Sequence, residues 1–193
     1  DLTLENIDLQ GTNYIGGVAG YALGAVTNCT VTGEITYLLQ NSYGVFLGGI
    51  AGRAENDLSG CTAELIITAN EVGGTAYAGG IAGYCAYNVQ NAESAVTLVS
   101  RSAVTITQAD NNSSRIYAGG IFGYAAERLN LQDCFAEGNI VITAENNNSY
   151  AGGLVGYFGY DNTLTNCYAT GDVSGGYYAG GLVGYFSSLD NTL

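Results

Sequence analysis

The sequence contains no histidine, lysine, proline, methionine or tryptophan, and its basic residues are four arginines, Arg53, Arg101, Arg115 and Arg128. Without histidine the chain cannot form the histidine-containing zinc sites of hydrolases, nor any Ser-His or Cys-His catalytic triad. Without lysine it cannot form the phosphate-binding loop, in which a lysine follows the glycine-rich turn. We therefore expect no catalytic residue, no metal site and no cofactor, and we predict that the protein is not an enzyme.

Positive charge is scarce, because 17 acidic residues give a formal net charge of −13. Nucleic-acid binding needs a basic surface, so no nucleic-acid partner is expected. No segment reaches the roughly 18 consecutive apolar residues of a membrane span, and no membrane insertion is expected. The first residues, "DLTLENIDLQ", have neither the basic nor the apolar region of a signal peptide.

Glycine is abundant, with 30 residues, and much of it lies in a repeated phrase that we call the glycine box. The box occurs six times, with its first glycine at residues 16, 48, 79, 119, 152 and 180, and the nine residues 150–158 recur unchanged at 178–186. An aromatic residue stands two positions before each glycine pair: Tyr14, Phe46, Tyr77, Tyr117, Tyr150 and Tyr178. Such self-similarity indicates a repeat architecture.

A second phrase, which we call the cysteine phrase, follows each complete box. It reads "VTNCTV" from Val26, "LSGCTA" from Leu58, "VQNAES" from Val89, "LQDCFA" from Leu131 and "LTNCYA" from Leu164. Before the first box, "LENIDL" from Leu4 has the same form, with Ile7 in the cysteine position. The phrase alternates apolar and polar residues, as half-buried strands do, and Gly, Asn and Asp supply the turns.

Three short strands in each repeat of roughly 30 residues predict an all-β fold, a right-handed parallel β-helix (β-solenoid) of about six coils. Residues 1–193 are expected to form one continuous domain, part of a longer chain. Equivalent residues of successive coils then lie above one another at about 4.8 Å. Glycine in the box is expected to tolerate positive φ and close backbone approach where the strand bends.

Four columns follow from this register. The aromatic residues before the boxes are expected to stack ring on ring. Ile50, Ile81, Ile121, Leu154 and Leu182 are expected to point into the core. The first residues of the cysteine phrase form a third buried column: Leu4, Val26, Leu58, Val89, Leu131 and Leu164. The fourth contains Ile7, Cys29, Cys61, Ala92, Cys134 and Cys167.

One repeat is longer than the others, because Gly79 and Gly119 are 40 positions apart, against 28 to 33 elsewhere. With "VQNAES" at its usual offset, the extra length falls within residues 95–116. Since insertions in solenoids carry function, this segment is the best candidate for a binding loop.

The stacked cysteines allow two states. Pairs Cys29/Cys61 and Cys134/Cys167 would be close enough for disulfides in an oxidising exterior. Ile7 and Ala92 in the same position favour buried free thiols, and both states stay open here.

Two stretches of the sequence, "GGLVGY" and "TLTNCYATGDVSGGYYAGGLVGYF", resemble the GLUG repeat. The resemblance covers nearly the whole chain and is weakest over residues 48–110, where Arg53 replaces the box tyrosine and Ala92 the cysteine. GLUG repeats occur in large bacterial surface and secreted proteins, including adhesin-like proteins and immunoglobulin-A-cleaving metallopeptidases, outside the catalytic domain. The resemblance implies a noncatalytic extracellular module.

Three other functions are compatible with parts of the sequence. β-Helix enzymes that act on polysaccharides use carboxylate pairs, and Glu127, Asp133, Glu137 and Asp161 are the candidates, but solvated surface charge is the favoured explanation for them. The 16 tyrosines could form a carbohydrate-binding surface, but a packed ladder is favoured. Ice binding would need a regular threonine face, which "TITQ", "IVIT" and "LIIT" only approach.

We therefore expect a stiff stalk or adhesion scaffold of a bacterial surface protein, extracellular or secreted, whose partner is a glycan or protein ligand on a host or neighbouring cell. The alternatives are a β-helix enzyme or binding module for polysaccharide and a filament-forming subunit. Because neither terminus reads as a polar cap, end-to-end self-association of open coils is also expected.

Overall fold

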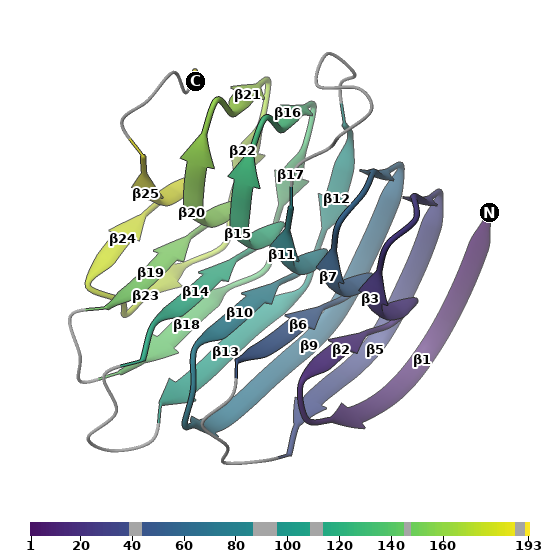
Figure 1. Ribbon diagram of the computed structural model, residues 1–193, viewed down its shortest axis with the longest axis horizontal. Helices are drawn as coiled ribbons and strands as arrows, with labels where there is room; N and C mark the ends of the chain where they lie inside the picture. Colours follow the sequence, from purple (N-terminus) through teal and green to yellow (C-terminus); the bar gives the residue numbers. More distant parts are fainter. Residues whose placement is uncertain (39–43, 87–95, 109–113, 145–147, 188–191) are drawn as a thin grey trace.

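The computed structural model describes residues 1–38, 44–86, 96–108, 114–144, 148–187 and 192–193. All regular elements in these ranges are β-strands, and neighbouring strands pair in parallel from one coil to the next. Figure 1 shows the coils stacked in sequence order, with the N-terminus at one end of the stack and the C-terminus at the other. The predicted parallel β-helix is confirmed, while its right-handed sense stays a prediction.

The two arms of the glycine box form two six-stranded sheets, which confirms the six coils. The strands that precede the box corner are β2 (Tyr14–Gly16), β6 (Val45–Gly48), β10 (Ala76–Gly79), β14 (Ile116–Gly119), β19 (Ser149–Gly152) and β24 (Tyr178–Gly180). The strands that follow it are β3 (Ala19–Ala22), β7 (Ala51–Ala54), β11 (Ala82–Cys85), β15 (Phe122–Glu127), β20 (Val155–Tyr160) and β25 (Val183–Phe186).

The third side of the solenoid is a nine-stranded sheet, which we call the wall. In the first coils its strands are long: β1 (Leu2–Gly11), β5 (Cys29–Tyr37) and β9 (Cys61–Val72). Beyond β9 each coil contributes two short strands: β12 (Leu98–Ser100) and β13 (Ala103–Gln108), β17 (Phe135–Ala136) and β18 (Ile140–Thr143), β22 (Tyr168–Ala169) and β23 (Val173–Ser174). Short strands at the remaining corner are β4 (Val26–Thr27), β8 (Leu58–Ser59), β16 (Asn130–Gln132) and β21 (Thr163–Thr165).

The core confirms most of the predicted aliphatic column. Ile50, Ile81, Ile121 and Leu154 are fully buried, whereas Leu182 in the sixth coil is 37% exposed. Within the described residues, no helix is long and apolar enough to cross a membrane.

The register of the cysteine phrase is confirmed in four coils. Val26 pairs with Leu58 and Leu131 with Leu164, and the cysteines that follow lie in neighbouring positions of one column. Leu58, Leu131 and Leu164 are buried, as are Cys29, Cys61 and Cys134, while Val26 and Cys167 are half-buried. The residue before each of these cysteines has a left-handed backbone conformation: Asn28, Gly60, Asp133 and Asn166.

In the first coil the predicted register is wrong. Strand β1 places Leu2 opposite Cys29, Leu4 opposite Val31 and Ile7 opposite Gly33. The phrase "LENIDL" therefore lies along the wall, where any alternating strand gives the same pattern of apolar and polar residues. Neither Leu4 nor Ile7 joins the columns to which it was assigned.

The third coil differs as well. Val89 and Ala92, which the sequence assigned to the two columns, lie outside the described residues. Their predicted positions are occupied by Val96, opposite Leu131, and by Leu98, opposite Cys61. Eleven positions separate Cys85 from Val96, against six from Ala125 to Leu131, so most of the extra length precedes Val96. A smaller part follows β13, because Val104 and Ile116 are twelve positions apart and their partners Ile140 and Ser149 only nine.

Candidate functional site

The corner of the glycine box brings the two box sheets together at close range. A Cβ on Gly120 would lie 2.3 Å from the carbonyl oxygen of Gly153 and 2.4 Å from the Ala136 Cβ on the wall. None of the box glycines has a positive φ. The expectation of positive φ is therefore wrong for the box, and glycine is needed because a side chain would strike neighbouring backbone.

The aromatic residues before the boxes form the predicted stack, which we call the first ladder. Tyr14, Phe46, Tyr77, Tyr117, Tyr150 and Tyr178 are in register, with successive ring centroids 4.7–5.1 Å apart and ring planes within 13° of parallel. Tyr77 lies between the fully buried Ala76 and Ala78, and its side chain leaves the opposite face of β10. The ladder therefore lies on the outer face of its sheet.

A second ladder, which the sequence reasoning missed, faces the first across the box corner. It consists of Tyr21, Arg53, Tyr84, Tyr124, Tyr157 and Tyr185, paired in register through the second box sheet. Rings of the two ladders meet edge to face, as Tyr117 and Tyr124 do at 5.2 Å and 90°. The tyrosine that ends five of the six boxes was the available signal, because its position repeats as regularly as the glycines.

Arg53 continues the second ladder with a guanidinium in place of a ring. Its guanidinium carbon lies 4.5 Å from the Tyr84 ring centroid and 5.7 Å from that of Tyr21, within the range of cation–π contacts. Arg53 also forms an ion pair with Glu55, which neutralises its charge locally. The second coil therefore keeps the stacking without adding a hydroxyl to the surface.

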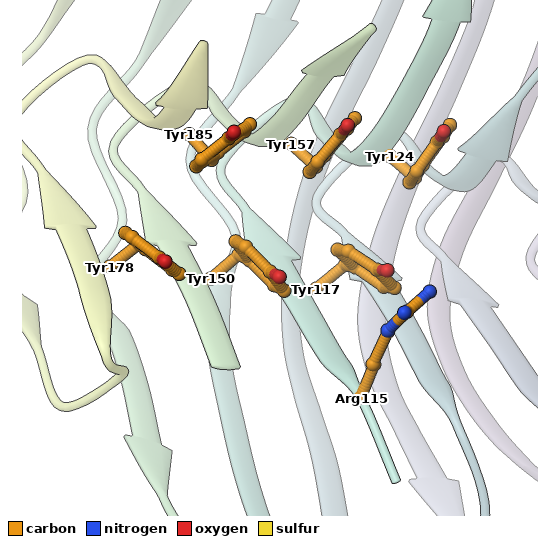
Figure 2. Close-up of a pocket in the computed structure, with 7 residues that line it drawn as sticks. All are labelled: Arg115, Tyr117, Tyr124, Tyr150, Tyr157, Tyr178 and Tyr185. Carbon is orange, nitrogen blue, oxygen red and sulfur yellow. The ribbon is translucent and has the colours of Figure 1, made fainter. Parts of the chain in front are cut away.

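Between the ladders lies a cavity of about 220 Å³, which we call the tyrosine groove. Figure 2 shows its two rows of rings, from the fourth to the sixth coil, with the arginine beside the first row. The lining residues are Arg115, Tyr117, Tyr124, Tyr150, Tyr157, Tyr178 and Tyr185. The groove is thus a site of phenol hydroxyls and one guanidinium, without any carboxylate.

Burial raises the pKa of four phenols of the groove further above physiological pH. Desolvation raises the pKa of Tyr117 to about 12, although the nearby Arg115 opposes the increase. Desolvation also raises the pKa of Tyr124, Tyr150 and Tyr157. These hydroxyls can therefore both donate and accept hydrogen bonds, whereas Arg115 carries the positive charge.

Three of the four candidate carboxylates interact with neighbouring side chains. Glu137 is paired with Arg101 at 2.8 Å and Asp161 with Arg128 at 3.8 Å, and Asp133 accepts a hydrogen bond from the Gln132 amide. All four, Glu127, Asp133, Glu137 and Asp161, are exposed. In the ranges that the structure describes, no three Asp, Glu or Cys side chains are arranged to hold a metal ion.

The five cysteines carry free thiols. The thiol of Cys134 donates a hydrogen bond to the carbonyl oxygen of Val96 at 3.0 Å, and that of Cys61 to Val26 at 3.5 Å in the coil before it. Desolvation raises the pKa of the fully buried Cys85 to about 12. These contacts make the buried cysteines small core residues that satisfy backbone carbonyls.

The threonines of the wall form only a short column. Thr36, Thr68 and Thr105 align on the wall, but the next coil has Val141 in that position. The column therefore lacks the regular extent that an ice-binding surface needs.

Comparison with known proteins identifies the GLUG motif at two places, residues 11–36 and 147–174. Each of the two segments includes a glycine box, the second-ladder residue that ends it and the cysteine phrase that follows. No curated protein and no solved structure matches the chain. The chain is therefore a repeat module that carries the GLUG motif, as its sequence features indicated.

Proposed function

We propose that this chain is a noncatalytic extracellular module of a bacterial surface protein, and that it serves as a stiff stalk and adhesion scaffold. The observation that carries the proposal is the continuity of backbone hydrogen bonding, which extends through the box corners as well as the strands. Gly49 donates to Gly80, Gly80 to Gly119 and Gly153 to Gly180, at 3.1–3.2 Å. In most folds the turns are the points where neighbouring segments separate; here the turns are bonded to each other too.

The side-chain ladders support the same role. Stacked aromatic pairs contribute roughly 0.5–1.5 kcal/mol each beyond burial. The first ladder has such a pair at every boundary between its six coils, and the second has one at each boundary from the third coil onward. A rod that is bonded at its corners and stacked along its surface resists bending and extension. The GLUG motif occurs in bacterial surface proteins, which supports the proposed location.

Two measurements test the proposal. Pulling the chain by its termini in a force microscope should give stepwise unfolding, coil by coil, at forces well above those of a helical bundle of the same length. Antibodies raised against the chain should label intact cells of the source bacterium. Unfolding at low force without steps would contradict the stalk, and labelling only after lysis would contradict the extracellular location.

A further inference from the structure

One arginine differs from the other three in its surroundings. Arg53, Arg101 and Arg128 each form an ion pair, with Glu55, Glu137 and Asp161. In the part of the chain that the structure describes, Arg115 forms none, although the sequence has about four acidic residues for each basic one (17 against 4). It instead forms a hydrogen bond with the Tyr117 side chain at the edge of the tyrosine groove.

The groove also presents hydroxyls that other described residues do not use. Tyr157 is hydrogen-bonded to Ser187 and Tyr117 to Arg115. For the remaining four phenols, Tyr124, Tyr150, Tyr178 and Tyr185, the described residues provide no hydrogen-bond partner. Tyr124 and Tyr150 are half-buried, and a ligand that hydrogen-bonds to these two phenols would pair hydroxyls that no described residue uses.

The stacking within each ladder decides how a ligand can bind. Tyr150 is covered on one face by Tyr117 at 4.9 Å and on the other by Tyr178 at 5.1 Å. Its ring faces are therefore not available to stack on a sugar ring, and only the hydroxyl-bearing edges face the groove (Figure 2). Recognition here depends on hydrogen bonds and on the charge of Arg115.

We propose that the tyrosine groove is a binding site for a sugar residue that carries a carboxylate, with the carboxylate on Arg115 and the sugar hydroxyls on the phenols of Tyr124 and Tyr150. The cavity of about 220 Å³ accommodates one sugar ring. A guanidinium binds a carboxylate by charge-assisted hydrogen bonds, and phenols that donate and accept match the hydroxyls of a sugar. The proposal specifies the ligand of the adhesion scaffold, so its biological meaning rests on the proposed function.

Charge restricts the ligand further. The net charge of −13 repels long polyanions, so one acidic sugar within an otherwise neutral glycan fits better than a uronate polymer. Toward the N-terminus the same surface changes, because Phe46 and Arg53 replace two phenols and Glu55 neutralises Arg53. The site therefore lies in the fourth to sixth coils.

The test is a titration of the full chain followed by the NMR signals of the groove residues, with four probes. Sodium glucuronate and N-acetylneuraminate carry both features, and they distinguish the two common sources of an acidic sugar. Glucose has the hydroxyls without the charge, and acetate has the charge without the hydroxyls. At least one acidic sugar should bind about tenfold more tightly than glucose and acetate, with binding weakened by salt.

Three variants identify the site. Arg115→Gln should lower the affinity about tenfold, while Arg101→Gln, which removes an arginine from the wall, should leave it unchanged. Tyr150→Phe should lower it several-fold without loss of fold, since Phe46 already occupies the first ladder. Equal binding of glucose, equal binding of acetate, unchanged affinity in Arg115→Gln or no binding by any probe would each overturn the proposal. These outcomes do not affect the pulling experiment, so the stalk proposal and the sugar-site proposal can be contradicted independently.

Discussion

In the N-terminal coils the wall consists of the uninterrupted strands β1, β5 and β9, whereas in the C-terminal coils each coil contributes two short strands. The difference is concentrated in one column, which contains Ile7, Gly33, Leu65, Ser102, Gly138 and Gly171 by register. At Gly138 a Cβ would lie 2.0 Å from the carbonyl oxygen of Ser102, while Leu65 in the same column is buried as a full side chain. One interior therefore accepts two kinds of wall. The coils with one long wall strand form what we call the straight half, and the coils with two short wall strands form the bent half.

The largest expected effect is at the box corner, and it tests whether the corner is equally tightly packed in the two halves. Gly49→Ala in the straight half and Gly120→Ala in the bent half should each lose about 3 kcal/mol of unfolding free energy, because a Cβ would meet a carbonyl oxygen at 2.2 or 2.3 Å. Gly181→Ala, in the same column but with nothing within 4 Å of its Cβ, should change little. Urea denaturation measures all three, and a large difference between the first two variants would contradict a common corner.

The next effect concerns the wall column itself. Leu65→Ala should cost about 2–3 kcal/mol because it leaves a cavity in the straight half. Gly138→Ala should cost about 2 kcal/mol for the opposite reason, since it inserts an atom where the bent wall has no space. Thermal unfolding of both variants separates the halves, and a neutral Gly138→Ala would mean that the bend does not require glycine.

Alkaline pH should weaken the bent half first. An unfolded phenol ionises near pH 10, whereas folded Tyr117 retains its proton to about pH 12. The stability that this phenol contributes is thus complete below pH 10 and is lost as the pH rises toward 12, because the unfolded state then binds fewer protons than the folded state.

The tyrosinate absorbance, followed alongside urea midpoints from pH 8 to 11.5, measures this effect. Tyr117→Phe should reduce the loss, and it imitates the straight half, where Phe46 occupies the same ladder. Titration of every tyrosine at or below pH 10 in the folded protein would refute the prediction.

The smallest expected effect is at Arg53, which stands in place of a tyrosine in the second ladder of the straight half. Arg53→Ala should cost about 1 kcal/mol, mainly through the lost contact with the Tyr84 ring at 4.5 Å. Arg53→Tyr should restore stacking and lie within about 0.5 kcal/mol of the natural protein. Equal losses in the two variants would show that charge, and not ring contact, holds this position.

The fold was predictable where a phrase repeats with little change. The box columns and the first ladder follow from the spacing of their glycines and aromatics, since stacked coils place equivalent residues together. The register failed at Ile7 and in the third coil, where alternation alone guided it. Leu98 pairs with Cys61 but is not itself a cysteine, and no residue with left-handed backbone precedes it, so the sequence does not mark its position.

The tyrosine groove was predictable only in part. The sequence shows two tyrosines in most boxes, but it does not state the angle between the two arms, which depends on backbone contacts at residues such as Gly83. That angle decides whether Tyr117 and Tyr124 face each other or point apart. The ion-pair partners of the arginines depend likewise on which coils become neighbours, so the distinct surroundings of Arg115 emerge only in three dimensions.

The ladders also give the protein an optical property. Without tryptophan, its ultraviolet emission comes from tyrosine, and stacked tyrosine rings 4.8–5.1 Å apart exchange excitation energy readily. Light absorbed by a ring in one coil can be emitted by a ring several coils away, so the emission should be depolarised even when the protein is immobilised in a glass. Emission polarisation then becomes a label-free gauge of how many consecutive coils remain stacked, because each break in the ladder confines the excitation to a shorter row.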